Sequence, residues 1–163
     1  METVKFYTGI PDRSDKVFWH EFWANKLAVM GRQIQIFSRP QRYRNQTVEL
    51  PDGTQHIMLV GEEKGIDVRI ALDVVRMAHR KEYDVALVFS QDQDLSEVVD
   101  EVRTISIDQD RRIKIACAYP VSPTYDNRRG INHTDWIQID RAAYSACIDS
   151  RDYGPKGAWR NAP

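Results

Sequence analysis

The chain has 163 residues, of which 42% are hydrophobic and 29% are charged, and its formal net charge is −1. This length and composition suit a single globular domain. No apolar run approaches the roughly 20 residues that span a bilayer, and the first residues lack the apolar stretch of a signal peptide. We therefore expect a cytoplasmic protein with no membrane segment.

The first half of the chain is predicted to form two strands joined by a helix, followed by a hairpin. Bulky apolar residues spaced by three or four positions indicate a helix between Ser14 and Gly31. Pro51-Asp52-Gly53 between two β-prone runs predicts a hairpin turn, and we expect the hairpin to project from the domain. The other expected elements are strands 3–8 and 34–37, a basic loop 38–44, and hairpin strands 47–50 and 56–60.

The second half alternates helices with apolar strands. The segment from Asp84 to Phe89 is nearly all apolar, which is typical of a strand buried on both faces in a parallel sheet. The tail is rich in Gly, Pro and charge, so we expect one domain over 1–150 and a flexible tail over 151–163. The expected elements are helices 66–80, 94–107 and 141–148, and strands 84–89, 113–119 and 136–139.

This alternation predicts an α/β fold with a mostly parallel sheet and right-handed crossovers. Ligands of such sheets bind beyond the carboxyl ends of the strands. Function is therefore expected just after Phe89 and just after Tyr119. The two cysteines, Cys117 and Cys147, and the four histidines show neither disulfide-framework nor zinc-ligand spacing, and Cys117 is expected in the core.

Three aspartates are predicted to converge at this edge of the sheet. Asp92 and Asp94 directly follow the strand 84–89, and Asp67 lies near the start of the preceding helix. Asp67 is expected to point inward, whereas Asp73 is rotated from it by roughly 120° and is expected in solvent. The apolar residues that share the face of Asp67 are Ile70, Ala71, Val74 and Ala78.

Carboxylates gathered in this way favour a divalent cation. At about 4 Å, each pair of charges repels by on the order of 1–4 kcal/mol, and a bound cation relieves this repulsion. Oxygen ligands without His or Cys favour Mg²⁺ or Mn²⁺, which activate water for attack on a phosphodiester. The segment 62–101 holds 11 acidic and 5 basic residues, and the surrounding basic excess would attract a polyanion.

Each of these residues also has a purely structural explanation. Asp94 to Glu97 fits a helix capping box, Asp92 fits a turn after a strand, and Asp67 complements a helix N-terminus. Lys64 could neutralise a phosphate or be an exposed loop lysine. Ser90 could orient water or satisfy backbone groups.

The chain resembles the NYN domain family of the PIN-like nuclease superfamily. The resemblance implies a three-layer α/β/α fold and metal-dependent endoribonuclease chemistry, with acidic roles for Asp67, Asp92 and Asp94 but none for Asp73. Its clearest part is Asp84–Asp94, and the combination of Lys64-Gly65-x-Asp67, a strand and Ser90-x-Asp92-x-Asp94 is fairly specific to the family. The matching segments are Tyr7–Gly9, Glu63–Val68 and Asp84–Asp94, and more weakly Ala118–Pro120 and Thr134–Trp136.

One feature of the family is missing from this pattern. Its members usually begin with a strand that carries an Asp and a nearby Asn, before the segment that matches 3–8. The chain could be a shortened version of a longer protein, the strand could come from another chain or from rearrangement, or catalysis could be lost. Asp12 and Asp15 could substitute only in part.

Two basic clusters are candidates for RNA contact. Arg39, Arg42, Tyr43 and Arg44 follow the strand 34–37, and Tyr125, Arg128 and Arg129 follow the strand 113–119. Arginine suits phosphate and tyrosine stacks on unpaired bases, which favours single-stranded RNA. Scattered surface arginines are the plainer explanation of both clusters.

We therefore predict a Mg²⁺- or Mn²⁺-dependent endoribonuclease, with a catalytically silent RNA- or protein-binding domain as the alternative. A weaker third hypothesis is a phosphatase with an aspartyl nucleophile in the Asp92-x-Asp94 pair. Self-association into a homo-oligomer is left open.

Overall fold

The computed structural model describes residues 3–12, 17–30, 34–124 and 129–154. Internal contacts divide the chain into two compact units, and each is described by itself. The first contains 1–66 and 151–163, and the second contains 67–150. Within the described part of the chain, every helix is too short or too polar to cross a bilayer.

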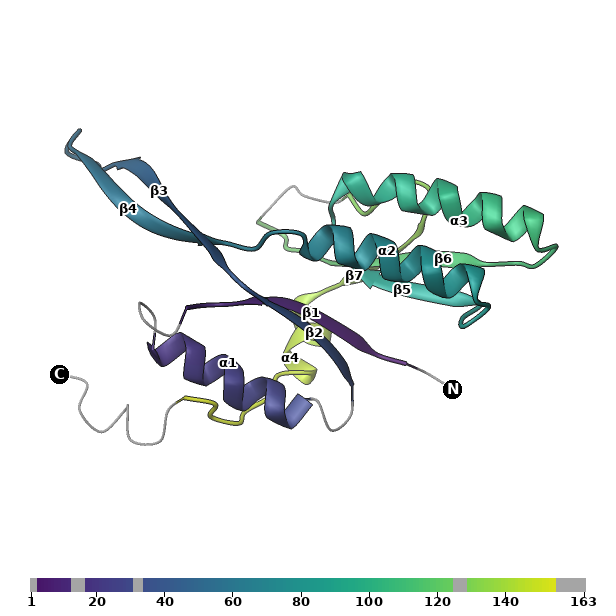
Figure 1. Cartoon of the computed structure of the whole chain (residues 1–163), viewed down its shortest axis with the longest axis horizontal. Coiled ribbons are helices and arrows are strands. Elements are labelled where there is room, and N and C mark those ends of the chain that lie inside the picture. Colours follow the sequence, from purple (N-terminus) through teal and green to yellow (C-terminus); the bar gives the residue numbers. More distant parts are fainter. Residues whose placement is uncertain (1–2, 13–16, 31–33, 125–128, 155–163) are drawn as a thin grey trace. The chain divides into compact units, whose positions relative to one another are not determined.

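The first unit begins with a strand, a helix and a parallel strand (Figure 1). β1 (Lys5–Ile10) pairs with β2 (Gln35–Pro40), with Phe6 beside Ile36 and Gly9 beside Arg39. α1 (Val17–Met30) connects the two strands, as the apolar spacing predicted. The ring of Trp23 stacks on that of Phe6 with 6.1 Å between centroids, so α1 covers one face of this small sheet. Ser14 lies outside the described residues.

The start of the tail is packed rather than loose. Tyr153 is buried, its ring makes an edge-to-face contact with Phe22, and its carbonyl accepts a hydrogen bond from Asn25. Lys26 lies over the same ring. Residues 151–154 are thus in contact with α1 through Tyr153, and 155–163 lie outside the described residues, so the flexible tail stays a prediction.

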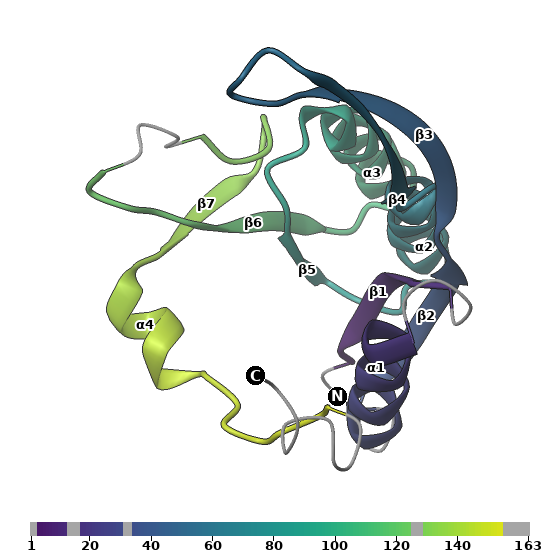
Figure 2. The same ribbon diagram turned by 90° about the vertical axis from the view of Figure 1, so that its left-hand side faces the viewer.

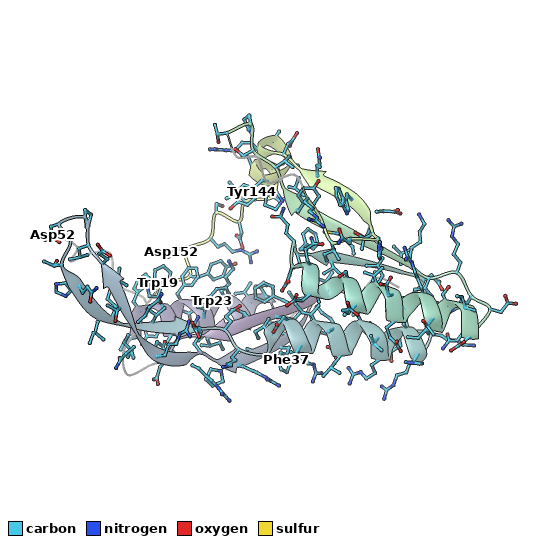
Figure 3. The ribbon with its side chains drawn as sticks, turned by 90° about the horizontal axis from the view of Figure 1, so that it is seen from above. Trp19, Trp23, Phe37, Asp52, Tyr144 and Asp152 are labelled. Atoms are coloured by element: carbon cyan, nitrogen blue, oxygen red, sulfur yellow. The ribbon has the colours of Figure 1, made fainter. Side chains whose placement is uncertain are left out.

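The hairpin of the first unit is longer than predicted. β3 (Arg42–Glu49) and β4 (Gln55–Glu62) pair antiparallel over their whole length. Asp52 accepts hydrogen bonds from the amide and hydroxyl of Thr54, and Gly53 has a φ of 81°, which glycine adopts without strain. Figure 3 shows Asp52 at the tip of this hairpin. The predicted basic loop 38–44 is wrong, since its residues continue β2 and begin β3.

The second unit is a three-stranded parallel sheet with helices on one face (Figure 2). β6 (Lys114–Pro120) lies between β5 (Val85–Phe89) and β7 (Asp135–Ile139). α2 (Ile66–His79) and α3 (Ser96–Asp108) pack on the sheet, and α4 (Arg141–Ala146) follows β7. The core residues are Ala78, Leu95, Val99, Val102, Ile105, Ile115, Cys117, Tyr119 and Ile131.

The prediction that β5 is buried on both faces is wrong. Ala86 and Val88 pack against the core, but Val85, Leu87 and Phe89 on the opposite face are exposed, Phe89 by 71%. The reason is that α2 and α3 cover one face of the sheet only. The described residues form two parallel sheets and a hairpin rather than one central sheet, so the three-layer arrangement stays a prediction.

Candidate functional site

The loop after β5 holds two of the predicted aspartates in a chain of short hydrogen bonds. The amide of Asp92 donates to Ser90 Oγ at 3.1 Å, and the amide of Asp94 donates to Asp92 Oδ1 at 3.0 Å. The buried thiol of Cys117, on the neighbouring strand β6, donates to the carbonyl of Ser90 at 2.8 Å. The carboxyl end of β5 is thereby fixed to the central strand, and both carboxylates are exposed at the edge that the parallel topology favours for ligands.

Two glutamines that the sequence did not indicate brace this loop. Gln93 donates to the carbonyl of Gly130 at 2.8 Å and accepts from the amide of Asn132. Gln91 donates to the carbonyl of Arg129 at 2.9 Å. Hydrogen bonds from both glutamines of the loop after β5 therefore hold it to the segment before β7. The only signal in the sequence was the alternation of Gln with Asp, which gives no hint of the partner.

The capping role belongs to Asp92 and not to Asp94. Asp92 caps a short 3₁₀ turn, η1 (Gln93–Leu95), by accepting from the amide of Asp94. α3 begins after Leu95, which makes no side-chain capping bond, so the predicted capping box at Asp94 is wrong. The 3₁₀ turn displaces the helix start by two residues. No described residue donates a hydrogen bond to the carboxylate of Asp94 or forms an ion pair with it. Both carboxylate oxygens are therefore available to a ligand.

The third aspartate behaves differently from its prediction. Asp67 lies in the first turn of α2 and is exposed, so the expectation that it points inward is wrong. Asp73 is instead the buried one, with 3% of its surface exposed, and it pairs with Arg69 at 3.1 Å and Arg76 at 2.8 Å. These arginines, four residues before and three after, neutralise the buried charge from the same helix.

The structure does not bring the three predicted ligands together as one metal cluster. Among the residues described, no three His, Cys, Asp or Glu side chains are close enough to hold an ion jointly. Asp92 and Asp94 share a loop, whereas Asp67 opens a helix. The predicted convergence of all three is therefore not observed.

In the first unit, Glu63 makes contacts at the end of β1 that the sequence did not predict. Its Oε1 accepts from the amide of Gly9 and, at 3.5 Å, from the hydroxyl of the buried Thr8. A Cβ at position 9 would lie 2.7 Å from Glu63 Cγ, so glycine is required for this approach. Lys64 is exposed, and Gly65 has a φ of 72°. Glu63 directly precedes Lys64 in the motif, but the motif alone did not indicate that Glu63 would bind Gly9 and Thr8.

The predicted RNA-contacting arginines of the first unit lie in strands. Arg39 is exposed near the end of β2 with its guanidinium over the ring of Phe37, and Arg42 is exposed at the start of β3. Arg44 is also exposed and pairs with Glu62 across the hairpin. In the second unit, the exposed Arg129 donates to Asn132. Tyr125 and Arg128 lie outside the described residues.

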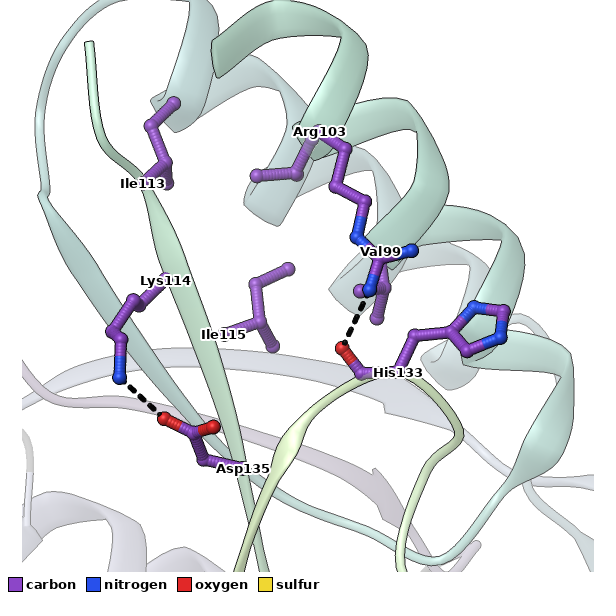
Figure 4. A pocket seen from close by; sticks show the side chains of 8 residues that line it. Val99, Arg103, Ile113, Lys114, Ile115, His133 and Asp135 are labelled. Carbon is purple, nitrogen blue, oxygen red and sulfur yellow. Dashed lines mark hydrogen bonds and ion pairs between the residues drawn. The ribbon is translucent and has the colours of Figure 1, made fainter.

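A small cavity lies at the opposite end of the three-stranded sheet (Figure 4). Its volume is about 120 Å³ and its floor is aliphatic. Lys114 and Asp135, the first residues of β6 and β7, lie at its rim. Lys114 donates to Asp135 at 2.7 Å and so holds the pKa of that carboxyl below its ordinary value. Arg103 donates to the carbonyl of His133. The rim charges are therefore already paired, and the cavity does not adjoin the loop of Asp92 and Asp94.

Comparison with known protein families gives a match over most of the chain. The profile described as NYN domain matches residues 3–130, which is most of the chain and includes β1 through β6. No curated protein matches.

Proposed function

The chain belongs to the NYN domain family, and from this premise we propose that it is a metal-dependent ribonuclease that hydrolyses RNA phosphodiester bonds. NYN domains are nuclease-like and RNA-related, and the family is consistent with the PIN-like superfamily. The residues proposed to act are Asp92 and Asp94, with Ser90 in support.

One observation supports this assignment above the others. Asp94 is an exposed carboxylate at the carboxyl end of a parallel strand, and no described residue occupies its oxygens. Its backbone is nevertheless held firmly, by Asp92 Oδ1 on one side and by the braces at Gln91 and Gln93 on the other. A fixed carboxylate with free oxygens suits a ligand better than a structural role.

These residues fit a hard divalent cation in part. Mg²⁺ keeps several waters and is commonly held by one or two carboxylates together with substrate phosphates, so a three-carboxylate cage is not required. Asp94 would hold the ion directly, with the remaining oxygens of Asp92 beside it. When bound, such an ion supplies activation of water and neutralisation of phosphate charge. Asp67 stays a candidate only, because it is not part of a described cluster.

The chain's own residues would position the RNA. Arg129 belongs to the segment before β7 that is bonded to the loop of Asp92 and Asp94, because Gln91 donates a hydrogen bond to its carbonyl. Its guanidinium is exposed and suits a phosphate oxygen. Arg39, Arg42, Arg44 and Lys64 of the first unit, and Tyr125 and Arg128, are proposed as further contacts with single-stranded RNA.

The proposal is tested with unstructured RNA, Mn²⁺ and purified full chain. We expect cleavage by the wild type and a loss of at least about 100-fold in Asp94→Asn, since even indirect metal partners are worth about 10–100-fold. Asp92→Asn keeps an oxygen able to cap the 3₁₀ turn, so its loss of activity would not reflect unfolding. Glu97→Gln, an exposed acid in the first turn of α3, is the matched control. Equal cleavage by wild type and Asp94→Asn would reject the proposal.

A second candidate function rests on a specific observation. Because no group of three acidic or metal-binding side chains forms among the described residues, a catalytically silent RNA- or protein-binding domain is the alternative. It predicts RNA binding that persists in EDTA and no cleavage with either Mg²⁺ or Mn²⁺. Binding that requires the cation, accompanied by cleavage, would exclude this alternative.

A further inference from the structure

The outer edge of β4 is unusual because it is apolar on both faces and open. β4 pairs with β3 on one side, and no described strand pairs with its other side. The middle of the strand is exposed by 72% at Ile57, 52% at Met58 and 49% at Leu59. Ile57 and Leu59 share one face of the hairpin, and Met58 lies on the other.

The open edge presents a regular row of backbone groups. The amide of Leu50 donates to the carbonyl of Thr54 at the turn, which fixes the alternation of hydrogen-bonded pairs along the hairpin. By that alternation, the residues of β4 whose N–H and C=O groups point away from β3 are Gln55, Ile57, Leu59 and Gly61. These four residues form a template for one further antiparallel strand.

Nothing along this edge discourages pairing. Natural proteins protect open edges with lysine, proline, bulges or very short strands. Between Gln55 and Gly61 there is no proline, lysine, arginine or carboxylate, and the eight-residue pairing with β3 is continuous. The neighbouring β3 differs, because it carries Arg42, Arg44 and Glu49. The open edge of β4 therefore lacks the charged residues that the open edge of β3 carries.

We propose that β4 pairs antiparallel with β4 of a second copy of this chain, about a two-fold axis at Met58. Met58 would face its counterpart in a non-hydrogen-bonded pair, since its own N–H and C=O point toward β3. Ile57 would face Leu59 of the second copy, and Leu59 would face Ile57, both in hydrogen-bonded pairs. Gln55 would likewise face Gly61. The result is a four-stranded antiparallel sheet in the order β3, β4, β4, β3.

The sequence of β4 favours a second copy in this register over an unrelated strand. Each aliphatic residue of the central three then faces an aliphatic residue, which is the pairing that stabilises sheets. Glu62 falls opposite Thr54, so no carboxylate faces another. Moving the axis to Val60 would place Glu62 opposite Met58, and moving it to Ile57 would place Asp52 opposite Glu62. The axis at Met58 avoids both, and an axis at Leu59 would instead leave Ile57 opposite Gly61, without an aliphatic partner.

A single strand pair makes a small interface. Interfaces below about 1,200 Å² belong to weak or transient complexes, so we expect a dimer with a Kd on the order of 1–100 μM. The dimer should therefore be visible at high protein concentration and be lost on dilution. This proposal is independent of ribonuclease activity.

The first experiment measures the mass of the full chain by sedimentation velocity over a dilution series. We expect a concentration-dependent dimer for the wild type and a monomer at every concentration for the double variant Ile57→Lys/Leu59→Lys. The matched control is Thr47→Lys/Asn45→Lys, which adds the same charge to the cross-strand partners of those residues on the same face. A wild type that stays monomeric, or a dimer that survives the β4 substitutions, would overturn the proposal.

A second experiment tests the register without depending on those variants. In a background with Cys147→Ser, which removes the exposed native thiol, Met58→Cys is expected to form a disulfide-linked dimer under mild oxidation. Ile57→Cys and Leu59→Cys should each cross-link at least about 10-fold more slowly, because each faces the other position. Faster cross-linking at 57 or 59 than at 58 would overturn the proposed axis.

Discussion

Two strands of this protein have similar apolar character and opposite surroundings. β6 carries Ile115 to Tyr119, all of them buried, whereas β4 carries Ile57 to Leu59, all of them exposed. β6 has a strand on each side and helices α2 and α3 over one face. β4 has one neighbouring strand, and no residue of its exposed half lies in the core.

The difference shows that hydrophobicity alone does not determine burial. A central strand is shielded from solvent at both edges by its neighbouring strands and on one face by the helices. A strand of an isolated hairpin remains open at one edge and on both faces, and two-stranded hairpins are at best marginally stable in water. The apolar run of β6 is buried within its own unit, whereas the apolar run of β4 would be covered by the proposed second copy.

The largest expected effect compares two isoleucines. Ile105→Ala removes a side chain that is 2% exposed in the core, and we expect a loss of about 2–5 kcal/mol in the free energy of unfolding. Ile57→Ala in β4 should change it by less than about 0.5 kcal/mol at low micromolar concentration, where no dimer forms. Urea denaturation measures both. Comparable losses would mean that β4 is packed against something in the monomer.

A smaller effect concerns Tyr83, which donates to the carbonyl of Val74 within the second unit. Burial raises the pKa of Tyr83 to about 12, and the charge of Arg111 opposes that rise. Because the folded pKa lies above the unfolded value, this contribution to stability is complete below about pH 10 and is lost as the pH rises toward 12. Tyr83 is only partly buried, so solvent screening limits the effect to about 1–2 kcal/mol.

The measurement is the free energy of unfolding at several pH values between 9 and 12 for the wild type and Tyr83→Phe. The wild type should lose its advantage over the variant across this range, because phenylalanine cannot ionise. An unchanged difference between the two proteins would contradict the assignment. In Arg111→Met, the tyrosinate absorbance should appear at still higher pH.

Next in size is the cap at the end of β5. Asp92→Ala removes the acceptor of the Asp94 amide and should cost about 0.5–2 kcal/mol, whereas Asp92→Asn should cost much less. Asp94→Ala should leave stability nearly unchanged, because Asp94 supports no described side-chain bond. Thermal denaturation of the three variants separates these roles. A larger loss at Asp94 than at Asp92 would return the capping role to Asp94.

The smallest effect belongs to the hairpin turn. The hydroxyl and amide of Thr54 hold the pKa of Asp52 below its ordinary value. Its contribution to the turn is therefore present above the unfolded pKa and is lost as the pH falls. Thr54→Val should move the pKa of Asp52 upward in an NMR titration. Asp135, whose pKa is lowered by Lys114 instead, should not respond and serves as the control.

The order of the elements could be predicted from the sequence, because the spacing of apolar residues and the positions of Gly and Pro depend on local structure. The helices α1, α2 and α3 and the strands β5, β6 and β7 follow the predicted order closely. The core position of Cys117 is confirmed as well. The basic segment before the hairpin could not be recognised as a strand, since polar residues such as Arg42 and Arg44 gain β-structure only by pairing with β4.

The site was harder to predict than the fold. Because Asp92 and Asp94 directly follow a strand, their place at an exposed edge could be predicted. The burial of Asp67 could not be predicted, because the face of a helix does not determine how deeply a residue of its first turn is buried. The prediction that Asp73 lies in solvent is wrong because Arg69 and Arg76 of the same helix neutralise its charge and allow it to be buried. The braces at Gln91 and Gln93 depend on a segment that lies 37 to 39 residues later, which no local pattern reveals.

The link between Gln93 and Asn132 also gives this protein an internal reporter. The amide of Asn132 donates to Gln93 Oε1, and Gln93 lies between the two aspartates proposed to bind a cation. An ion or phosphate that binds the loop would alter this hydrogen bond. The backbone amide resonance of Asn132 should therefore shift in a ¹⁵N spectrum as the ion or phosphate is added. Occupancy could thus be followed far along the chain from the carboxylates themselves, with no RNA substrate and no turnover.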